Sequence, residues 1–257
     1  RKKRNMLEGK KTSDVVIIGG GFTGLATAYF LNSQGLEATI LEEHHVGWGA
    51  SGRNAGMLTT GYKKSSTTLA KKVGLNQSEN LLNMSVDCIK LVDEIVNQHK
   101  IDCSINYCGG LKLAYKASHY DNLKKEQEFL LEKFNYQTKI IEPNRLNEEI
   151  NSPFYRYGGL LDPHSYSFHP LNYAIGLAKV VEQIGGKIYE DSKAVSIEKS
   201  QGKYQVKTQG GEIEASDIVI ATNGYSSSIT KTLKKSIIPI DSHAIATEPL
   251  SRELSQK

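Results

Sequence analysis

The chain has 257 residues, which is long enough for one large or two ordinary globular domains. Of these residues 39% are hydrophobic and 23% charged, as in an ordinary globular protein. Its net charge of +4 resides in residues 1–11, which carry six basic side chains and one acidic one and leave 26 basic against 27 acidic residues elsewhere. This balance excludes a body that binds nucleic acid, and no apolar run is long enough to span a membrane or to act as a secretory signal.

The basic segment 1–11 is expected to be a flexible terminus, because charged chain ends are usually frayed and solvated. Three cysteines, Cys88, Cys103 and Cys108, have no metal-binding or C-x-x-C spacing. We therefore expect reduced thiols, no metal site and a cytoplasmic location.

A strand–turn–helix–strand pattern over residues 14–42 is the most informative feature of the sequence. An apolar strand leads into a G-x-G-x-x-G turn formed by Gly19, Gly21 and Gly24. Gly19 permits the tight turn, Gly21 lets the backbone approach a pyrophosphate, and Gly24 lets the helix pack closely on the sheet. The pattern predicts a βαβ unit that binds a dinucleotide.

Two further features complete this predicted site. The helix begins at Phe22 and Thr23, where free N–H groups and a partial positive charge favour phosphates. The second strand ends at Glu42, whose carboxylate can accept hydrogen bonds from ribose hydroxyls. Glu43 takes that role if the strand register shifts by one residue.

A glycine-rich loop over residues 47–56 follows, and the remaining elements suggest a nucleotide domain that is interrupted by an insert. We predict helices over 77–98, 118–134, 143–150 and 170–184, and strands over 187–190, 194–197, 204–207, 213–215, 218–221 and 236–248. The expected fold class is α/β: a Rossmann-like domain with a βαβ opening and an inserted α+β lobe.

The motif order resembles the FAD-dependent D-amino-acid oxidase-like family, and most of all its γ-glutamylputrescine oxidase branch. Three segments carry the likeness: the βαβ fingerprint of residues 14–42, the run Gly-Ala-Ser-Gly-Arg-Asn-Ala-Gly at residues 49–56, and the strand end Ala-Thr-Asn-Gly at residues 221–224. Members of this family continue past the last strand seen here, so the resemblance implies the N-terminal portion of a member, C-terminally truncated.

The resemblance implies a discontinuous FAD-binding domain over 12–95 and 155–235, and an incomplete substrate lobe over 96–154 and 236–257. It also implies oxidation of the C–N bond of an amine or amino acid, with hydride transfer to flavin N5 and hydrolysis of the imine product. The partners would be a small amine or amino acid and an electron acceptor, which is oxygen or another oxidant. No nucleic-acid partner and no membrane span are expected.

The resemblance also extends the list of cofactor-binding candidates. In the glycine-rich loop, Ser51 would donate to a phosphate oxygen and Gly52 and Asn54 would offer backbone N–H groups. Arg53 would pair with a phosphate or with a substrate carboxylate. Further candidates come from the later strands: Val195, Ala221, Thr222 and Gly224.

Several alternatives stay open at this level. His44 or His45 could carry the flavin or could be ordinary loop residues, Trp48 could flank the flavin ring or simply pack, and no general base is singled out. The fingerprint alone also fits an NAD-dependent dehydrogenase. A third alternative is a dinucleotide-binding fragment without catalysis.

Overall fold

The structure is a computed structural model that describes residues 3–226, 229–240, 243, 245 and 247–255. It forms two compact units. The first comprises Arg1–Ala55, His99–Cys103 and His169–Ser242, and the second comprises Gly56–Gln98, Ser104–Phe168 and His243–Lys257. Each unit is described by itself below. No helix in the described ranges is both long enough and apolar enough to cross a membrane.

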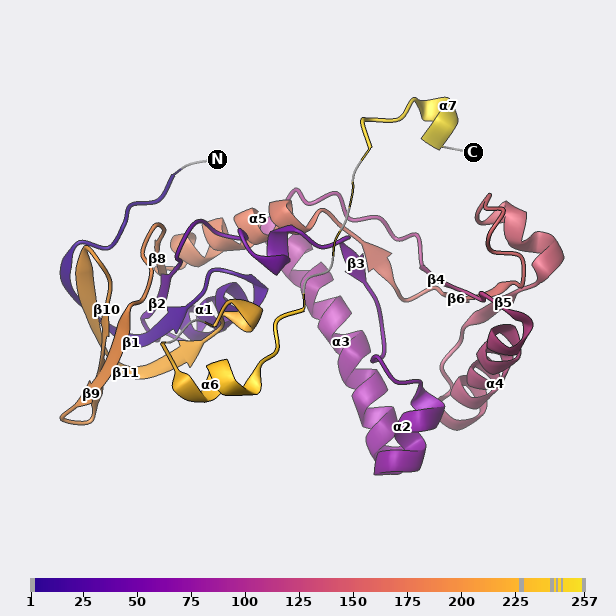
Figure 1. Ribbon diagram of the computed structural model, residues 1–257, viewed down its shortest axis with the longest axis horizontal. Coiled ribbons are helices and arrows are strands. Elements are labelled where there is room, and N and C mark those ends of the chain that lie inside the picture. Colours follow the sequence, from indigo (N-terminus) through magenta and orange to yellow (C-terminus); the bar gives the residue numbers. More distant parts are fainter. Residues whose placement is uncertain (1–2, 227–228, 241–242, 244, 246, 256–257) are drawn as a thin grey trace. The chain divides into compact units, whose positions relative to one another are not determined.

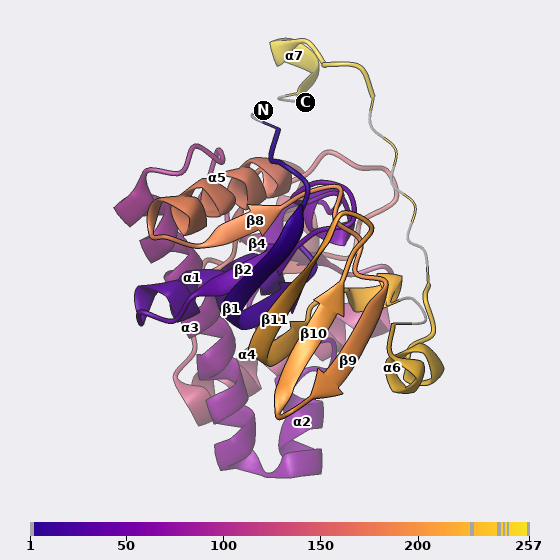
Figure 2. The same ribbon diagram turned by 90° about the vertical axis from the view of Figure 1, so that its left-hand side faces the viewer.

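A six-stranded mixed sheet forms the centre of the first unit, with the strand order β8-β2-β1-β11-β10-β9 (Figure 2). The strands are β1 (Gly9–Ile18), β2 (Ala38–Leu41), β8 (Lys187–Tyr189), β9 (Ser196–Ser200), β10 (Lys203–Lys207) and β11 (Gly211–Ile220). Four neighbouring strands run parallel: β8, β2, β1 and β11. At the other edge, β11, β10 and β9 form an antiparallel meander. The strands β1 and β2 end in continuous buried apolar runs, as parallel strands covered on both faces require.

The helices of the first unit are α1 (Phe22–Ser33), α5 (Pro170–Gln183) and α6 (Lys231–Ser236), with 3₁₀ turns η1 (Ala50–Gly52) and η3 (Asn223–Tyr225). The helices α1 and α5 pack against each other, and Leu25 and Ala28 of α1 and Leu177 of α5 are fully buried. A core cluster on the sheet contains Val16, Leu41, Val206 and Ile213.

Two elements of this unit differ from the sequence-based expectations. The strands expected over 213–215 and 218–221 are one strand, β11, because it pairs in register with all of β1, from Gly9 and Gly211 to Ile18 and Ile220. The terminus expected to be frayed is anchored at two residues, because Arg4 is 9% exposed and Leu7 is fully buried in the core cluster. The other residues from 5 to 12 are exposed. Ion pairs and apolar burial thus hold a segment whose charge pattern indicated a solvated end.

The second unit contains α2 (Ser66–Val73), α3 (Leu75–His99), α4 (Ala117–Phe134), η2 (Pro143–Glu148) and α7 (Arg252–Ser255) (Figure 1). Its three-stranded antiparallel sheet has the order β4 (Gly110–Leu113), β6 (Gly159–Asp162) and β5 (Lys139–Ile141). A two-stranded pair joins β3 (Met57–Leu58) to β7 (Tyr166–Ser167). The strand expected over 236–248 is not seen in its described residues, and residues 241, 242, 244 and 246 lie outside the described part.

A buried carboxylate at the end of β6 ties parts of the second unit together. Asp162 is 7% exposed, and its Oδ1 accepts from the backbone N–H of His164 at 3.0 Å. The hydroxyl of Thr60 donates to Oδ2, and the hydroxyl of Tyr136 lies 2.9 Å from Oδ1. Burial first, and then the charge of Asp162, raise the pKa of Tyr136 above its usual range.

Candidate functional site

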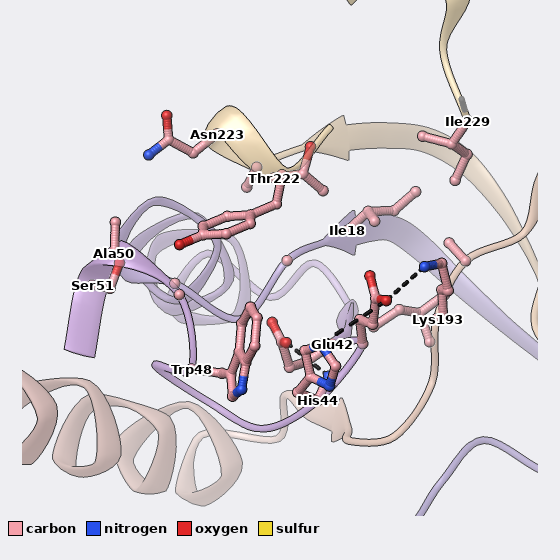
Figure 3. Close-up of a pocket in the computed structure, with 18 residues that line it drawn as sticks. Ile18, Glu42, His44, Trp48, Ala50, Ser51, Lys193, Thr222, Asn223 and Ile229 are labelled. Carbon is pink, nitrogen blue, oxygen red and sulfur yellow. Dashed lines mark hydrogen bonds and ion pairs between the residues drawn. The ribbon is translucent and has the colours of Figure 1, made fainter. Parts of the chain in front are cut away.

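A cavity of about 330 Å³ opens in the first unit at the carboxyl ends of β1, β2 and β11. The chain continues from β1 through α1 to β2 on one side, whereas β11 pairs with the other side of β1. The crevice outside such a reversal of strand order is where α/β proteins bind ligands. The cavity, drawn in Figure 3, is lined by Ile18, Gly19, Gly21, Leu41, Glu42, Glu43, His44, Trp48, Gly49, Ala50, Ser51, Lys193, Ala194, Ala221, Thr222, Asn223, Tyr225 and Ile229.

The turn from β1 into α1 requires glycine for steric reasons. Gly19 has a φ of +112°, and a Cβ there would lie 2.7 Å from the carbonyl oxygen of Ala221. A Cβ on Gly24 would lie 1.9 Å from the carbonyl oxygen of Gly19, so the helix reaches this close to the turn only without a side chain. The backbone is therefore left uncovered where the turn borders the cavity.

The first turn of α1 is tied to the glycine-rich loop. Ser51 Oγ accepts a hydrogen bond from the N–H of Phe22 at 2.9 Å. The same oxygen would lie 2.8 Å from a Cβ on Gly21, so this glycine also makes room for the loop. All residues of the first turn of α1 are described and none is acidic, so no side-chain charge opposes the partial positive charge of the helix start.

The two neighbouring acids differ in their surroundings. Glu42 Oε2 accepts from the N–H of Gly20 at 2.7 Å, and its Oε1 accepts from the N–H of His44 at 2.9 Å. Glu43 is 41% exposed at its side chain and forms an ion pair with Lys193 at 2.6 Å. Backbone donors thus fix the orientation of Glu42, whereas a surface cation holds Glu43.

A stack of side chains forms the wall of the cavity beside these acids. The rings of Trp48 and His44 lie side by side with centroids 4.0 Å apart (Figure 3). The guanidinium of Arg53 lies 4.4 Å from the centroid of the Trp48 ring, and Tyr225 approaches Trp48 edge-on at 5.7 Å. Arg53 does not line the cavity itself, but it contacts Trp48, which does.

The structure brings seven of the sequence-predicted site residues to this cavity: Gly19, Gly21, Glu42, Glu43, Ser51, Ala221 and Thr222. Phe22, Thr23 and Gly24 lie beside it in the first turn of α1. Five others do not line it: Gly52, Arg53, Asn54, Val195 and Gly224. The side-chain amide of Asn54 donates to the carbonyl oxygens of Ala50 and Ser51, both at 3.1 Å, and Val195 is 50% exposed.

Sequence reasoning missed four residues that line the cavity near the later strands, Lys193, Ala194, Asn223 and Ile229. Lys193 and Ala194 directly precede Val195, so the resemblance had pointed to the segment in which they lie. No local pattern marks Ile229, because only the return of the chain beyond η3 brings it to the cavity.

These residues suit a dinucleotide. One cavity is bordered by a glycine turn in which Cβ atoms would collide, by a helix start without an acidic side chain and by a fixed carboxylate after β2. Its volume falls within the range of roughly 300 to 1,000 Å³ that is usual for ligand pockets. The arrangement can bind phosphate at the helix start and hydroxyl groups at Glu42.

Comparison with known proteins points in the same direction. The family model described as "FAD dependent oxidoreductase" (DAO) matches residues 14–257. A probable oxidoreductase OrdL of Haemophilus influenzae is 34% identical over 248 residues, which cover 95% of this chain and 57% of the relative. The gamma-glutamylputrescine oxidoreductase of Escherichia coli is 32% identical over 246 residues, again covering 95% and 57%. The chain thus spans little more than half the length of these relatives.

Solved structures share the fold. A glycine oxidase from Geobacillus kaustophilus superposes with a TM-score of 0.69 at 23% identity, covering 85% of this chain and 57% of that one. An L-amino acid deaminase from Proteus vulgaris that lacks its specific insertion reaches a TM-score of 0.70 at 22% identity, covering 91% and 59%. These likenesses confirm the expected mixed α/β fold.

Proposed function

The chain belongs to the FAD dependent oxidoreductase (DAO) family, and on this premise we propose that the cavity of the first unit holds FAD and that the protein oxidises the C–N bond of an amine or amino acid. The observation that carries the first part is the meeting of the glycine turn and Glu42 at one cavity. The family assignment decides between the two dinucleotides that the fingerprint allows, in favour of FAD.

Each part of the cavity has a role in this proposal. Gly19, Gly21 and Gly24 leave the backbone open to the pyrophosphate, while Phe22 and Thr23 begin the helix whose positive end faces it. Glu42 accepts from the ribose hydroxyls, because two of the roughly four lone-pair positions of a carboxylate remain after its two backbone donors.

The remaining candidates act around this centre. Ser51 fixes the first turn of α1, Ala221 and Thr222 close the cavity from β11, and Arg53 supports the Trp48 ring. Gly52 lets the loop fold tightly, since a Cβ there would lie 2.1 Å from the carbonyl oxygen of Gly47. Cofactor contacts of Asn54, Val195 and Gly224 stay predictions, as does the division into an FAD domain and a substrate lobe.

When bound, the flavin supplies the hydride acceptor for the oxidation. The contribution of this chain is to hold the adenosine half, to orient the cofactor and to exclude water around it. The names of the relatives support an amine as substrate, because gamma-glutamylputrescine oxidoreductase and glycine oxidase are named for compounds that bear an amino group.

The proposal is tested by titrating the chain with FAD and, separately, with NAD. Trp48 is the single tryptophan of the sequence and lines the cavity, so its fluorescence reports binding directly. We expect FAD to quench this fluorescence with saturation and NAD to leave it unchanged. A folded chain that binds NAD but not FAD would overturn the cofactor assignment. Oxidation of amines in a panel that includes γ-glutamylputrescine and glycine then tests the reaction class.

A further inference from the structure

A buried ion pair beside the cavity has no part in the cofactor contacts proposed above. Glu190 is 1% exposed and Arg4 is 9% exposed. The guanidinium of Arg4 donates from Nη1 to Glu190 Oε1 at 3.3 Å. The backbone N–H of Arg4 donates to Glu190 Oε2, also at 3.3 Å. The other edge of the guanidinium forms a bidentate pair with Glu182, with both distances 2.8 Å. Burial alone would lower the pKa of Arg4, but its bonds to Glu182 and Glu190 outweigh this and raise it.

Glu190 also binds the loop that carries the cavity wall. Its Oε1 accepts a hydrogen bond from the N–H of Val46 at 2.9 Å, and Val46 is fully buried between His44 and Trp48 in the sequence. The backbone around Glu190 continues this attachment, since the N–H of Asp191 donates to the carbonyl oxygen of His44 at 2.9 Å. One carboxylate therefore links the N-terminal segment to the loop from Glu42 to Trp48.

The rings of the wall contact one another, Arg53 and Tyr225, but part of their surface borders open space. A second cavity of about 440 Å³ is lined by Lys3, His44, His45, Trp48, Glu190 and Asp191. His44 and Trp48 thus face open space in two cavities, so packing cannot fix their rings as it fixes a core residue. A rigid attachment through the backbone can supply the missing constraint.

We propose that Arg4 and Glu190 are positioning residues that hold the His44–Trp48 wall in its binding geometry. A buried carboxylate is costly unless it is paired, so the guanidinium of Arg4 compensates Glu190 and keeps its Oε1 directed at the N–H of Val46. Arg4 lies outside residues 14–257 that match the family model. The consequence for cofactor affinity rests on the proposed function, whereas the consequence for the wall does not.

The first test needs no cofactor. In R4M and in the double variant R4M/E190Q, which leaves no unpaired buried charge, the single tryptophan should become more accessible to acrylamide and its emission should shift to the red. The matched control is R145M, which removes an exposed Arg–Glu ion pair in the second unit. Circular dichroism identifies a temperature at which all variants are folded. Equal accessibility of Trp48 in R4M, R4M/E190Q and wild type would overturn the inference.

The second test measures FAD affinity at the same temperature. R4M and R4M/E190Q should raise the dissociation constant by about tenfold, the scale of one lost charge-assisted hydrogen bond. R4K should fall between R4M and wild type, because lysine keeps the charge but not the fork that meets two carboxylates. A lowered melting temperature with unchanged affinity would reduce Arg4 to a stabilising residue and overturn the inference. If wild type itself binds no FAD, the proposed function fails, and the fluorescence test still decides whether Arg4 and Glu190 hold the wall.

Discussion

The two units each hold a carboxylate at the end of a strand, and the two carboxylates are treated differently. Glu42 follows β2, lines the cavity and takes its hydrogen bonds from backbone N–H groups of Gly20 and His44. Asp162 ends β6, is 7% exposed and is surrounded by the side chains of Thr60 and Tyr136. The first carboxylate is held from one side and is open on the other, whereas the second is enclosed.

This difference in surroundings suits Glu42 to binding a ligand and Asp162 to stabilising the fold. A carboxylate oriented by nearby backbone donors keeps lone pairs for a ligand, and its orientation is set before the ligand arrives. A carboxylate enclosed by hydroxyl groups uses its hydrogen-bonding capacity inside the fold, where each unpaired group would be costly. We therefore expect the two acids to respond in opposite ways to the same substitution.

The largest effect is expected for Asp162→Ala. The substitution leaves the hydroxyl of Thr60 and the N–H of His164 without their acceptor, and it leaves Tyr136 only the hydroxyl oxygen of Thr60 at 3.0 Å. We expect a cost of about 3 kcal/mol in unfolding free energy. Urea unfolding measures this loss. Asp162→Asn, which keeps one acceptor oxygen, should cost less. FAD affinity of the folded variant should equal that of wild type, and a large loss of affinity would remove the contrast with Glu42.

The same network predicts a dependence on alkaline pH. Because the pKa of Tyr136 is raised in the folded state, its neutral form is favoured there, and the resulting stability is fully present below the unfolded pKa of about 10. This contribution is lost as the pH rises above that value. Comparing Tyr136→Phe with wild type by urea unfolding from pH 8 to 11 should show the difference in stability shrinking with pH. A difference that stays constant would contradict this account.

A smaller effect, on binding, is expected for Glu42→Ala. Loss of a charged acceptor should weaken FAD by roughly 1.5 to 3 kcal/mol, while unfolding free energy should fall by less than in Asp162→Ala, because water in the cavity can reach the freed N–H groups. Titration followed through Trp48 measures the first quantity. Glu42→Gln keeps the shape and one acceptor oxygen, and should lose less affinity. Unchanged FAD affinity in Glu42→Ala would refute the ribose assignment.

Ser51→Ala should have a still smaller effect. The N–H of Phe22 loses its acceptor, which is comparable to the loss of a helix cap, so stability should fall by about 1 kcal/mol. FAD affinity should decline with it, since the first turn of α1 borders the cavity. Ser65→Ala is a matched control, because Ser65 caps α2 in the second unit through the N–H of Thr68. It should cost similar stability without a change in FAD binding.

The smallest effect is expected for Lys193→Met. The ion pair between Lys193 and Glu43 is about half exposed, and such surface pairs contribute roughly 0 to 1 kcal/mol. FAD affinity should therefore change little, and any change should diminish in high salt. A strong, salt-sensitive loss of affinity would instead assign Glu43 and Lys193 a direct part in binding.

The sequence by itself determined the features that depend on neighbouring residues. The βαβ opening, the glycine turn at Gly19 and Gly24, and the acid at the end of β2 follow from local periodicity and from backbone sterics within one turn. These features were sufficient to predict an α/β fold that binds a dinucleotide, whereas the choice of FAD over NAD came from the resemblance to a family.

Only the tertiary structure decided the contacts between distant segments. Ser51 meets Phe22 across 29 residues, Lys193 meets Glu43 across 150, and Arg4 meets Glu190 across 186. Arg53, which is expected to pair with a phosphate or a substrate carboxylate, also lies over the ring of Trp48, a contact that the sequence did not indicate. A charged side chain interacts with the partner that the packing of the fold places nearest to it. The distance between two residues far apart in the sequence cannot be read from a sequence pattern. The same reason explains why Arg4, expected in solvent with the rest of the basic N-terminal segment, lies buried against Glu190.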